Sequence, residues 1–213
     1  MTATFLLDRT ARELHDASGR CFDTLTRTWT GTPSGERGDA VEIIDALAAV
    51  AWLQRESRHP LRLPIGVIGP TEATPAQFVV AMQVGELLAG CGLVVICGGG
   101  HGVAQALCDG VKRVGGMAIG VLPGAEPAAA NAFVSVILAT GIGEACHALM
   151  ASAAYCVVAI GDTPSGIALA RQSGKMVVVL ERTAQNDGVV RAADARAAVE
   201  TVAMAVLGMT SSS

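Results

Sequence analysis

A glycine cluster in the middle of the chain constrains the fold more than any other stretch. The apolar, β-branched run Leu93–Cys97 leads into Gly98–Gly102, and a helical pattern begins at Val103. We therefore predict a strand, a tight loop and a helix. Glycines permit positive φ and leave backbone N–H groups uncovered, and a helix N-terminus carries a partial positive charge. An anionic group fits at this point, most naturally a phosphate.

The glycine cluster matches neither standard phosphate-binding template. It lacks the Lys-Ser/Thr pair of a P-loop, and unlike the dinucleotide fingerprint it follows the second predicted core strand rather than the first. Glycines at a strand-to-helix turn can also serve close packing alone. The surrounding elements must therefore decide between phosphate binding and packing.

From Leu63 onward, strand-like and helix-like patterns alternate strictly, which is typical of a parallel sheet covered by helices on both faces. One helix start is marked by Thr74 as N-cap, Pro75 at the first helical position and Gln77 at the third. We predict an α/β fold, a Rossmann-like doubly wound parallel sheet of about six or seven strands. The predicted strands are Ile65–Ile68, Leu93–Cys97, Met117–Val121, Val134–Leu138, Cys156–Ile160 and Met176–Leu180, with later helices near residues 144–152, 165–173 and 189–207.

The first 60 residues have a different pattern. Residues 1 to about 30 alternate apolar and polar side chains and are typical of a small β-meander, and residues 31–38 have the composition of a linker. Asp39, with Glu42 three residues later, looks like a capping box, and apolar residues at helical spacing predict a helix over Asp39–Gln54. We therefore predict a meander-plus-helix extension at residues 1–60 and a Rossmann-like nucleotide- or phosphate-binding domain at residues 61–213.

The predicted sheet places a ligand site at one edge. In such folds the ligand crevice lies beyond the carboxyl ends of the strands. Four of the predicted strands end there in small or turn-forming residues, which favours phosphate or nucleotide binding over glycines that only make turns. The predicted ligand-binding residues are Gly69, Pro70, Thr71, Gly98, Gly99, Gly100, His101, Gly102, Thr140, Gly141, Ile142, Gly143, Gly161, Asp162 and Thr163.

Composition narrows the range of partners. Apolar residues make up 51% of the chain and charged residues 16%, so much of it must be buried in a two-sided sheet or against another subunit. We expect a homodimer or a higher homo-oligomer. The net charge of −4 and the lack of a Lys/Arg run argue against nucleic acid as a partner. The chain begins without a signal-peptide pattern and has no long uninterrupted apolar run, so we expect a cytoplasmic protein without a membrane partner.

The six cysteines are scattered. They form no C-x-x-C motif, and no two histidines have metal-ligand spacing. We therefore expect no metal site, no disulfide framework and no required cofactor, with most cysteines acting as small buried hydrophobes.

Several segments, taken in order, resemble one protein family. They are IGVIGP, VVICGGGHGVAQALCDGVKRVGGMAIGVLP, Asn131, LATGIGEACHALMASAAYCVVAIG and SGIALARQSGKMVVVL. Across residues 63–182 they are similar to the Lonely Guy-type family of Rossmann-like proteins. That family includes nucleoside 5′-monophosphate phosphoribohydrolases, long labelled lysine decarboxylases, and molybdenum cofactor carriers. The resemblance implies a small phosphorylated ligand, either a nucleotide or the molybdenum cofactor.

The chain departs from the family's enzymes at two positions. By resemblance, those enzymes use the Glu of a G-G-x-G-T-x-x-E motif, and an Arg on the preceding helix, to act on the ribose and base of the nucleotide. A carboxylate stabilises oxocarbenium character and the leaving base needs a proton, so such groups suit N-glycosidic cleavage. This chain has Cys146 at the Arg position and Gly166 where the Glu belongs. We therefore expect binding to persist and phosphoribohydrolase activity to be lost.

Three residues are candidates for substitute catalytic groups. Asp162 could approach a ribose hydroxyl or could be an ordinary turn or helix-cap residue. Glu144 and His147 lie three residues apart on one predicted helical face, where His147 could protonate a leaving base or serve as a structural histidine. His101, in the glycine cluster, could contact a phosphate or face solvent.

Three functions are thus compatible with the sequence. The first is a carrier or sensor that binds a phosphorylated, nucleotide-like ligand, and it is the one we favour. The second is a phosphoribohydrolase with rewired catalytic residues. The third is a structural subunit that binds another protein through residues 1–60.

Overall fold

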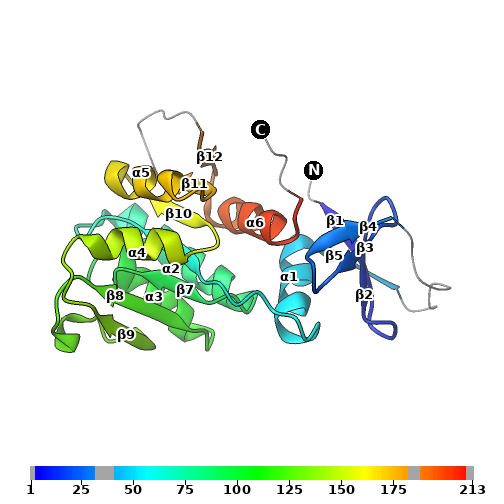
Figure 1. The fold of residues 1–213 in the computed structure, drawn as a ribbon, viewed down its shortest axis with the longest axis horizontal. Coiled ribbons are helices and arrows are strands. Elements are labelled where there is room, and N and C mark those ends of the chain that lie inside the picture. Colours follow the sequence, from blue (N-terminus) through cyan, green and yellow to red (C-terminus); the bar gives the residue numbers. More distant parts are fainter. Residues whose placement is uncertain (1–2, 32–40, 182–187, 210–213) are drawn as a thin grey trace. The chain divides into compact units, whose positions relative to one another are not determined.

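The structure is a computed structural model that describes residues 3–31, 41–181 and 188–209 (Figure 1). The chain divides into two compact units. Residues 1–61 and 200–213 form the first, and residues 62–199 form the second. The domain boundary that the sequence places between residues 60 and 61 stays a prediction. None of the described helices is both long and apolar enough to cross a bilayer.

The first unit contains a five-stranded antiparallel sheet. Phe5, Leu7 and Leu14 are buried in its core, and Trp29 stacks on Phe5 with ring centroids 5.8 Å apart and contacts Phe22 at 4.9 Å. The predicted β-meander is therefore confirmed for the first four strands. The strands are β1 (Thr4–Asp8), β2 (Glu13–Asp16), β3 (Cys21–Asp23), β4 (Thr28–Thr30) and β5 (Val41–Asp45), in the spatial order β4-β3-β2-β1-β5.

The helix predicted over Asp39–Gln54 is wrong in its first part. Val41–Asp45 form β5, which pairs antiparallel with β1, and α1 occupies Ala46–Arg55. The N-cap is Asp45, whose carboxylate accepts a hydrogen bond from the Ala48 N–H at 2.8 Å. β-Branched residues suit a strand as well as they fit a helical period, so the free edge of β1 decides the outcome. The predicted cap Asp39 and most of the predicted linker lie outside the described residues.

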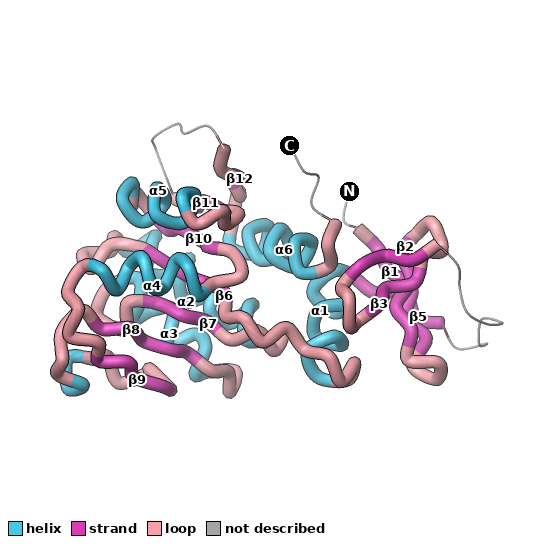
Figure 2. Tube along the Cα trace, viewed as in Figure 1, coloured by secondary structure: helices cyan, strands magenta, loops and turns pink. Residues whose placement is uncertain are grey.

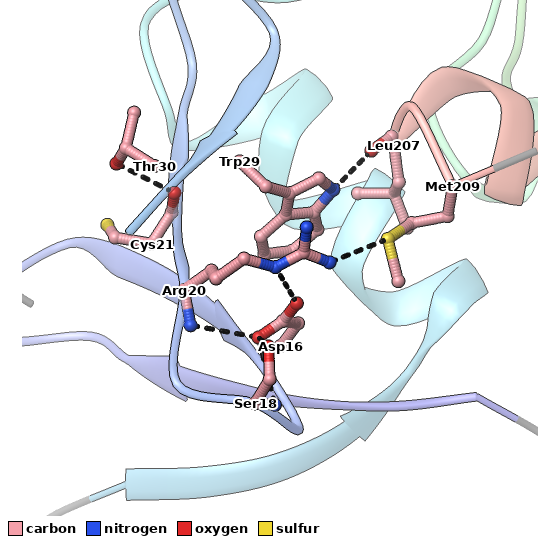
Figure 3. A network of polar contacts seen from close by, with 8 residues as sticks. All are labelled: Asp16, Ser18, Arg20, Cys21, Trp29, Thr30, Leu207 and Met209. Atoms are coloured by element: carbon pink, nitrogen blue, oxygen red, sulfur yellow. Dashed lines mark hydrogen bonds and ion pairs between the residues drawn. The ribbon is translucent and has the colours of Figure 1, made fainter. Parts of the chain in front are cut away.

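A hydrogen-bonded turn joins β2 to β3 around Asp16, as Figure 3 shows. The buried Asp16 carboxylate accepts bonds from the N–H and hydroxyl of Ser18, at 3.0 and 2.7 Å, and from the N–H and Nε of Arg20, at 2.9 and 2.7 Å. Burial alone would raise the pKa of Asp16, but together these hydrogen bonds and the Arg20 charge hold that pKa below its ordinary value. The ionised form therefore stabilises the turn.

The Asp16→Asn variant is expected to lower the free energy of unfolding at pH 7 by about 1–3 kcal/mol, because an amide is uncharged and is a poorer acceptor for these donors. A carboxyl whose folded pKa is depressed contributes stability above its unfolded pKa, near ~3.9, and loses it as pH falls through the folded value. The difference between variant and wild type should therefore shrink below about pH 4. Urea unfolding at pH 7 and at acid pH measures this. An equal difference at both pH values would contradict the assignment.

The C-terminal end of the last helix belongs to the first unit. The sequence predicts a helix over residues 189–207, but Val190–Arg191 form β12 and α6 spans only Ala195–Val206. Arg27 Nη2 donates to the Val206 carbonyl at 3.0 Å. Trp29 Nε1 donates to the Leu207 carbonyl at 2.7 Å, as Figure 3 shows. These two donors satisfy carbonyls that a helix end leaves without intrahelical partners.

The second unit confirms the predicted doubly wound parallel sheet (Figure 2). Its seven strands have the order β12-β11-β10-β6-β7-β8-β9, so β7 to β9 are added on one side of β6 and β10 to β12 on the other, and the direction of winding reverses between β6 and β10. That reversal is the topological switch point at which such folds bind ligands. The strands are β6 (Ile65–Ile68), β7 (Val95–Cys97), β8 (Ala118–Leu122), β9 (Val136–Ala139), β10 (Val157–Ile160), β11 (Val177–Leu180) and β12.

Helices cover both faces of this sheet. Helices α4 and α5 pack on one face, where Met150 and Ala170 join strand residues such as Ile96 and Val157 in one apolar cluster. Helices α2 and α3 pack against each other and contact the inner strands. Their bounds, with that of a short 3₁₀ helix, are α2 (Pro75–Gly90), α3 (Val103–Arg113), η1 (Pro127–Ala129), α4 (Ala145–Ala153) and α5 (Pro164–Gln172).

Two local features fix α2. The predicted capping box is confirmed, because the Gln77 N–H donates to Thr74 Oγ1 at 3.2 Å and the Thr74 N–H donates to Gln77 Oε1 at 3.0 Å.

Further along α2, its backbone lies in close contact with the backbone of α3. A Cβ added at Gly110 would overlap the Met82 carbonyl, and one added at Gly85 would overlap the Leu107 carbonyl. Both glycines are therefore needed for the close helix crossing.

Candidate ligand-binding site

Two adjoining cavities lie in the second unit, around the carboxyl ends of its central strands. One, of about 410 Å³, extends from β6 and α4 to the start of α5, and the other, of about 370 Å³, extends from β6 to the glycine loop and the end of β8. Each volume lies in the range of small-molecule sites, and together they offer room for an extended ligand. The lining residues common to both are Ile68, Gly69, Thr71, Glu144, His147 and Met150.

Hydrogen bonds from Asn131 anchor the loop Gly98–Gly102. The backbone N–H and the Nδ2 of this buried residue donate to the Gly99 carbonyl, at 2.8 and 2.9 Å, and Nδ2 also donates to the Gly100 carbonyl at 2.8 Å. Two carbonyls of the loop are thereby tied down. Asn131 belongs to the segments that resemble the family, but its role as an anchor depends on a contact across about thirty residues that no local pattern reveals.

The other polar side of the loop has free donors. Within the described part of the chain, no acceptor receives the N–H groups of Gly100, His101 or Ala104, whereas the Val103 N–H donates to the Pro70 carbonyl at 3.1 Å. Uncovered N–H groups at the first turn of a helix form an anion-binding nest. His101 is exposed and lines the second cavity, with its Nδ1 3.4 Å from Gln105 Oε1.

The loop glycines have two different roles. Gly99 and Gly102 have φ of +70° and +64°, and a Cβ would meet the Gly120 Cα at 2.9 Å in the first case and the Pro70 and Thr71 carbonyls in the second. These two glycines shape the loop. A Cβ on Gly98 or Gly100 would meet no heavy atom within 4 Å, and both residues line the second cavity. They leave space open beside the free N–H groups.

The loop after β6 also contributes to the site. A Cβ on Gly69 would overlap the Val103 side chain, so this glycine lets the start of α3 approach β6. The Pro70 carbonyl then accepts from the first N–H of that helix, and Thr71 lines both cavities. The structure thus brings Gly69 and Thr71 together with the glycine loop, as the sequence predicted.

The segment Thr140–Gly143 is a turn rather than a wall of either cavity. The Thr140 hydroxyl donates to the Leu122 carbonyl at 2.7 Å, and the Gly143 N–H donates to the Pro123 carbonyl at 2.9 Å. Gly141 and Gly143 have positive φ, and Ile142 is half exposed. These four predicted residues are absent from the described lining of both cavities, and they connect β9 to α4.

The loop after β10 lines the first cavity through Asp162 and Thr163 but not through Gly161. Gly161 has φ of +74°, and its N–H donates to the Leu180 carbonyl at 2.9 Å, so it makes the turn. The hydroxyl oxygen of Thr163 is buried without a hydrogen-bond partner. An unsatisfied buried polar atom costs about 1–3 kcal/mol and therefore requires an explanation.

Glu144 and His147 stand at the wall that the two cavities share. His147 Nδ1 lies 3.0 Å from Glu144 Oε2, and their side chains are 44% and 88% exposed. They are close enough to exchange a proton with each other. Of the candidate acid–base groups, this pair is the one that both cavities can use.

The two positions at which the sequence differs from the family's enzymes have different surroundings. Cys146 is buried in the apolar cluster under α4, and burial, with a smaller contribution from the charge of Glu144, raises the pKa of its thiol. Gly166 lines the first cavity, but a Cβ there would meet Ile68 Cδ1 at 2.7 Å. Neither position provides a charged group to the site.

Two buried cysteines flank the glycine loop in the sequence, Cys97 at the end of β7 and Cys108 on α3. Cys97 Sγ is 3.6 Å from Cys108 Sγ, and both thiols are free. The hydrogen bond to Cys108, together with burial, raises the pKa of Cys97 well above its ordinary value. Cys97 is therefore a neutral, buried thiol at the residue that precedes the loop. Five of the six cysteines are buried and Cys21 is half-buried, as the composition suggested for most of them.

The sequence model of the SLOG cluster4 family matches residues 62–206. The chain belongs to the SLOG cluster4 family. The match includes the whole parallel sheet and both cavities, and the Lonely Guy-type placement is confirmed. The N-terminal sheet of this SLOG cluster4 protein lies outside the match.

Solved structures similar to this SLOG cluster4 protein include two that are described by their ligand. The molybdenum cofactor binding protein from the phototrophic bacterium Rippkaea orientalis is 29% identical, with a TM-score of 0.65 over 68% of this chain and 99% of that one. The Moco carrier protein from Chlamydomonas reinhardtii is 32% identical, with a TM-score of 0.62 over 70% and 100%. An uncharacterized protein of Archaeoglobus fulgidus is 34% identical over 122 residues, which are 56% of this chain and 80% of that protein.

Proposed function

We propose that this protein is a carrier or sensor that binds a small phosphorylated ligand, the molybdenum cofactor or a nucleotide, and does not hydrolyse it. The observation that carries the proposal is the row of free N–H groups at Gly100, His101 and Ala104, which opens into the second cavity. A phosphate at this point accepts those hydrogen bonds and faces the positive end of α3. The similarity to proteins described as binding or carrying the molybdenum cofactor supports the choice of ligand.

The rest of the ligand extends from the phosphate toward the shared wall. Thr71, Glu144 and His147 offer polar groups there, while Ile68 and Met150 offer apolar contact. A few polar groups in a mainly apolar wall fix the orientation of a ring system without reacting with it. The buried Thr163 hydroxyl lies beside the first cavity, where a ligand group that entered could give it a partner.

Ligand-dependent stabilisation tests this proposal. The purified chain is heated with nucleoside monophosphates, with a dinucleotide, with inorganic phosphate and with molybdopterin-type ligands. Mass spectrometry identifies any molecule that co-purifies. We expect at least one organic phosphate to raise the melting temperature more than phosphate alone does. Stabilisation by none of these compounds would contradict the binding proposal and favour a structural subunit.

A second candidate function, a phosphoribohydrolase with rewired catalytic groups, has one observation in its favour, the Glu144–His147 pair between the cavities. Nevertheless, we expect no measurable release of base from purine nucleoside 5′-monophosphates at concentrations that saturate binding, because neither Cys146 nor Gly166 provides the family's acid–base group and each such group contributes about 10²–10⁴ in rate. Chromatography of the free base measures this. Turnover that is lost in His147→Ala or Asp162→Asn would overturn the non-enzymatic proposal.

We also propose that the chain forms a homo-oligomer through the edge strand β9. Val136, Ile137 and Leu138 are 40%, 42% and 43% exposed, and among the described strands theirs pairs only with β8. An exposed apolar edge strand is a template for further pairing. We expect light scattering at micromolar concentration to give a dimer or larger, and Ile137→Lys to shift it toward the monomer. A monomeric wild type would contradict this.

A further inference from the structure

Three side chains with different chemistries meet on one face of the N-terminal sheet. Glu13 and His15 are two residues apart on β2, so both point to the same face, and Cys21 on β3 is paired directly with His15. One ligand atom from each residue lies within 4.8 Å of the other two. His15 Nε2 is 3.2 Å from Glu13 Oε2.

The histidine of this cluster is buried without enough partners. His15 is only 5% exposed, and its Nδ1 has no hydrogen-bond partner among the residues that the structure describes. A ring nitrogen in that position carries the desolvation cost of a polar group with nothing to compensate it. Such orphaned atoms in a native structure require an explanation, and an absent ion is one of the usual ones.

Negative charge surrounds the thiol. Burial raises the pKa of Cys21, and the nearby carboxylates of Glu13 and Asp23 raise it further. A divalent cation would reverse the effect of these charges, because it favours the thiolate and is attracted by the carboxylate. The two carboxylates thus disfavour the thiolate but attract a cation, and Glu13 and His15 place two further ligand atoms within 4.8 Å of the Cys21 sulfur.

We propose that Glu13, His15 and Cys21 form a zinc site. Thiolate sulfur, imidazole nitrogen and carboxylate oxygen together are ligands that Zn²⁺ prefers, whereas Ca²⁺ and Mg²⁺ require oxygen ligands. Bonds of about 2.0–2.3 Å place tetrahedral ligand atoms roughly 3.3–3.8 Å apart, so the three side chains need to move inward by only about 1 Å. Binding releases the Cys21 thiol proton to solvent, and the fourth position stays open for water or a further ligand.

A metal site was not predicted from the sequence, because the three proposed ligands, Glu13, His15 and Cys21, form no short metal-binding motif. His15 and Cys21 come together through pairing across the β2–β3 turn, which Asp16 and Arg20 hold in place. The site lies in the first unit and takes no part in phosphate binding by the second. Its failure would therefore leave the proposed function unaffected.

Zinc titration of the full-length protein tests the proposal. After dialysis against a chelator, the protein competes with a chromophoric zinc indicator. We expect one Zn²⁺ per chain, and an affinity loss of more than about 100-fold in Cys21→Ser and in His15→Gln, because even the loss of an outer partner costs about 10–100-fold. The control His59→Gln changes an exposed histidine outside the cluster and should bind zinc as the wild type does.

Two readouts do not require the variants to fold. Co²⁺ in place of Zn²⁺ should give thiolate-to-metal absorption in the wild type, and Zn²⁺ should slow the reaction of Cys21 with a thiol reagent, since the other five cysteines are buried. Zinc binding that is absent at micromolar concentration, or that survives in Cys21→Ser, would overturn the proposal. An equal loss of affinity in His59→Gln would also overturn the assignment of the three ligands.

Discussion

Gly100→Val is expected to abolish ligand-induced stabilisation and to weaken binding of the phosphorylated ligand by at least about 100-fold, while the ligand-free protein keeps its melting temperature. An added Cβ at this position meets no heavy atom within 4 Å and the backbone does not have positive φ, so the fold accepts a side chain. The branched side chain would occupy the space beside the free N–H groups that the phosphate requires. At a ligand concentration 100 times the Kd, about 2.7 kcal/mol of stabilisation would disappear.

The matched control for this variant is Gly124→Val. Gly124 follows β8, also lacks positive φ, and a Cβ there would meet nothing within 4 Å, but it is not among the described residues that line either cavity. This control should bind the ligand as the wild type does. Calorimetric titration of both variants gives the comparison, and wild-type affinity in Gly100→Val would exclude the glycine loop as the phosphate site.

Gly110→Ala is expected to cause the largest loss of stability, roughly 3–5 kcal/mol in the free energy of unfolding. Alanine in a helix interior normally stabilises by about 1 kcal/mol relative to glycine. Here the added methyl group would overlap the Met82 carbonyl and lie 3.1 Å from the Glu86 backbone nitrogen, so α2 and α3 must separate. Urea denaturation measures the change.

Gly90→Ala provides the opposite expectation at the end of α2. A Cβ at Gly90 would meet nothing within 4 Å, so this substitution should be neutral or stabilise by up to about 1 kcal/mol. If Gly110→Ala also left the protein as stable as the wild type, the close crossing of the two helices would be wrong.

Elements defined by local chemistry were predictable from the sequence. The capping box of Thr74 and Gln77 and the apolar strand Ile65–Ile68 depend on neighbours within a few residues, and both were predicted at the positions observed. Val41–Asp45 was not predictable in the same way, because it is a strand only through its pairing with β1. The same holds for Val190–Arg191, which pair with β11.

The candidate site was predictable as a place but not in its details. The rule that ligands bind at the carboxyl ends of parallel strands indicated the loops after β6, β7 and β10, which contribute lining residues to the two cavities. It could not distinguish Gly100, which lines a cavity, from Gly99, which packs on β8, because that difference depends on distances to a neighbouring strand. Nor could it show that Cys146 points into the apolar core.

Asn131, which anchors the glycine loop, lies at the start of the segment that leads into β9. Its side-chain oxygen accepts from the Phe133 N–H at 3.0 Å, so the anchor and the approach to the edge strand form one hydrogen-bonded piece. If copies of the chain assemble through β9, this piece would connect the anion nest to the contact between subunits. Linkage is reciprocal. Any effect of the ligand on assembly would then be matched by an equal effect of assembly on the affinity for the ligand.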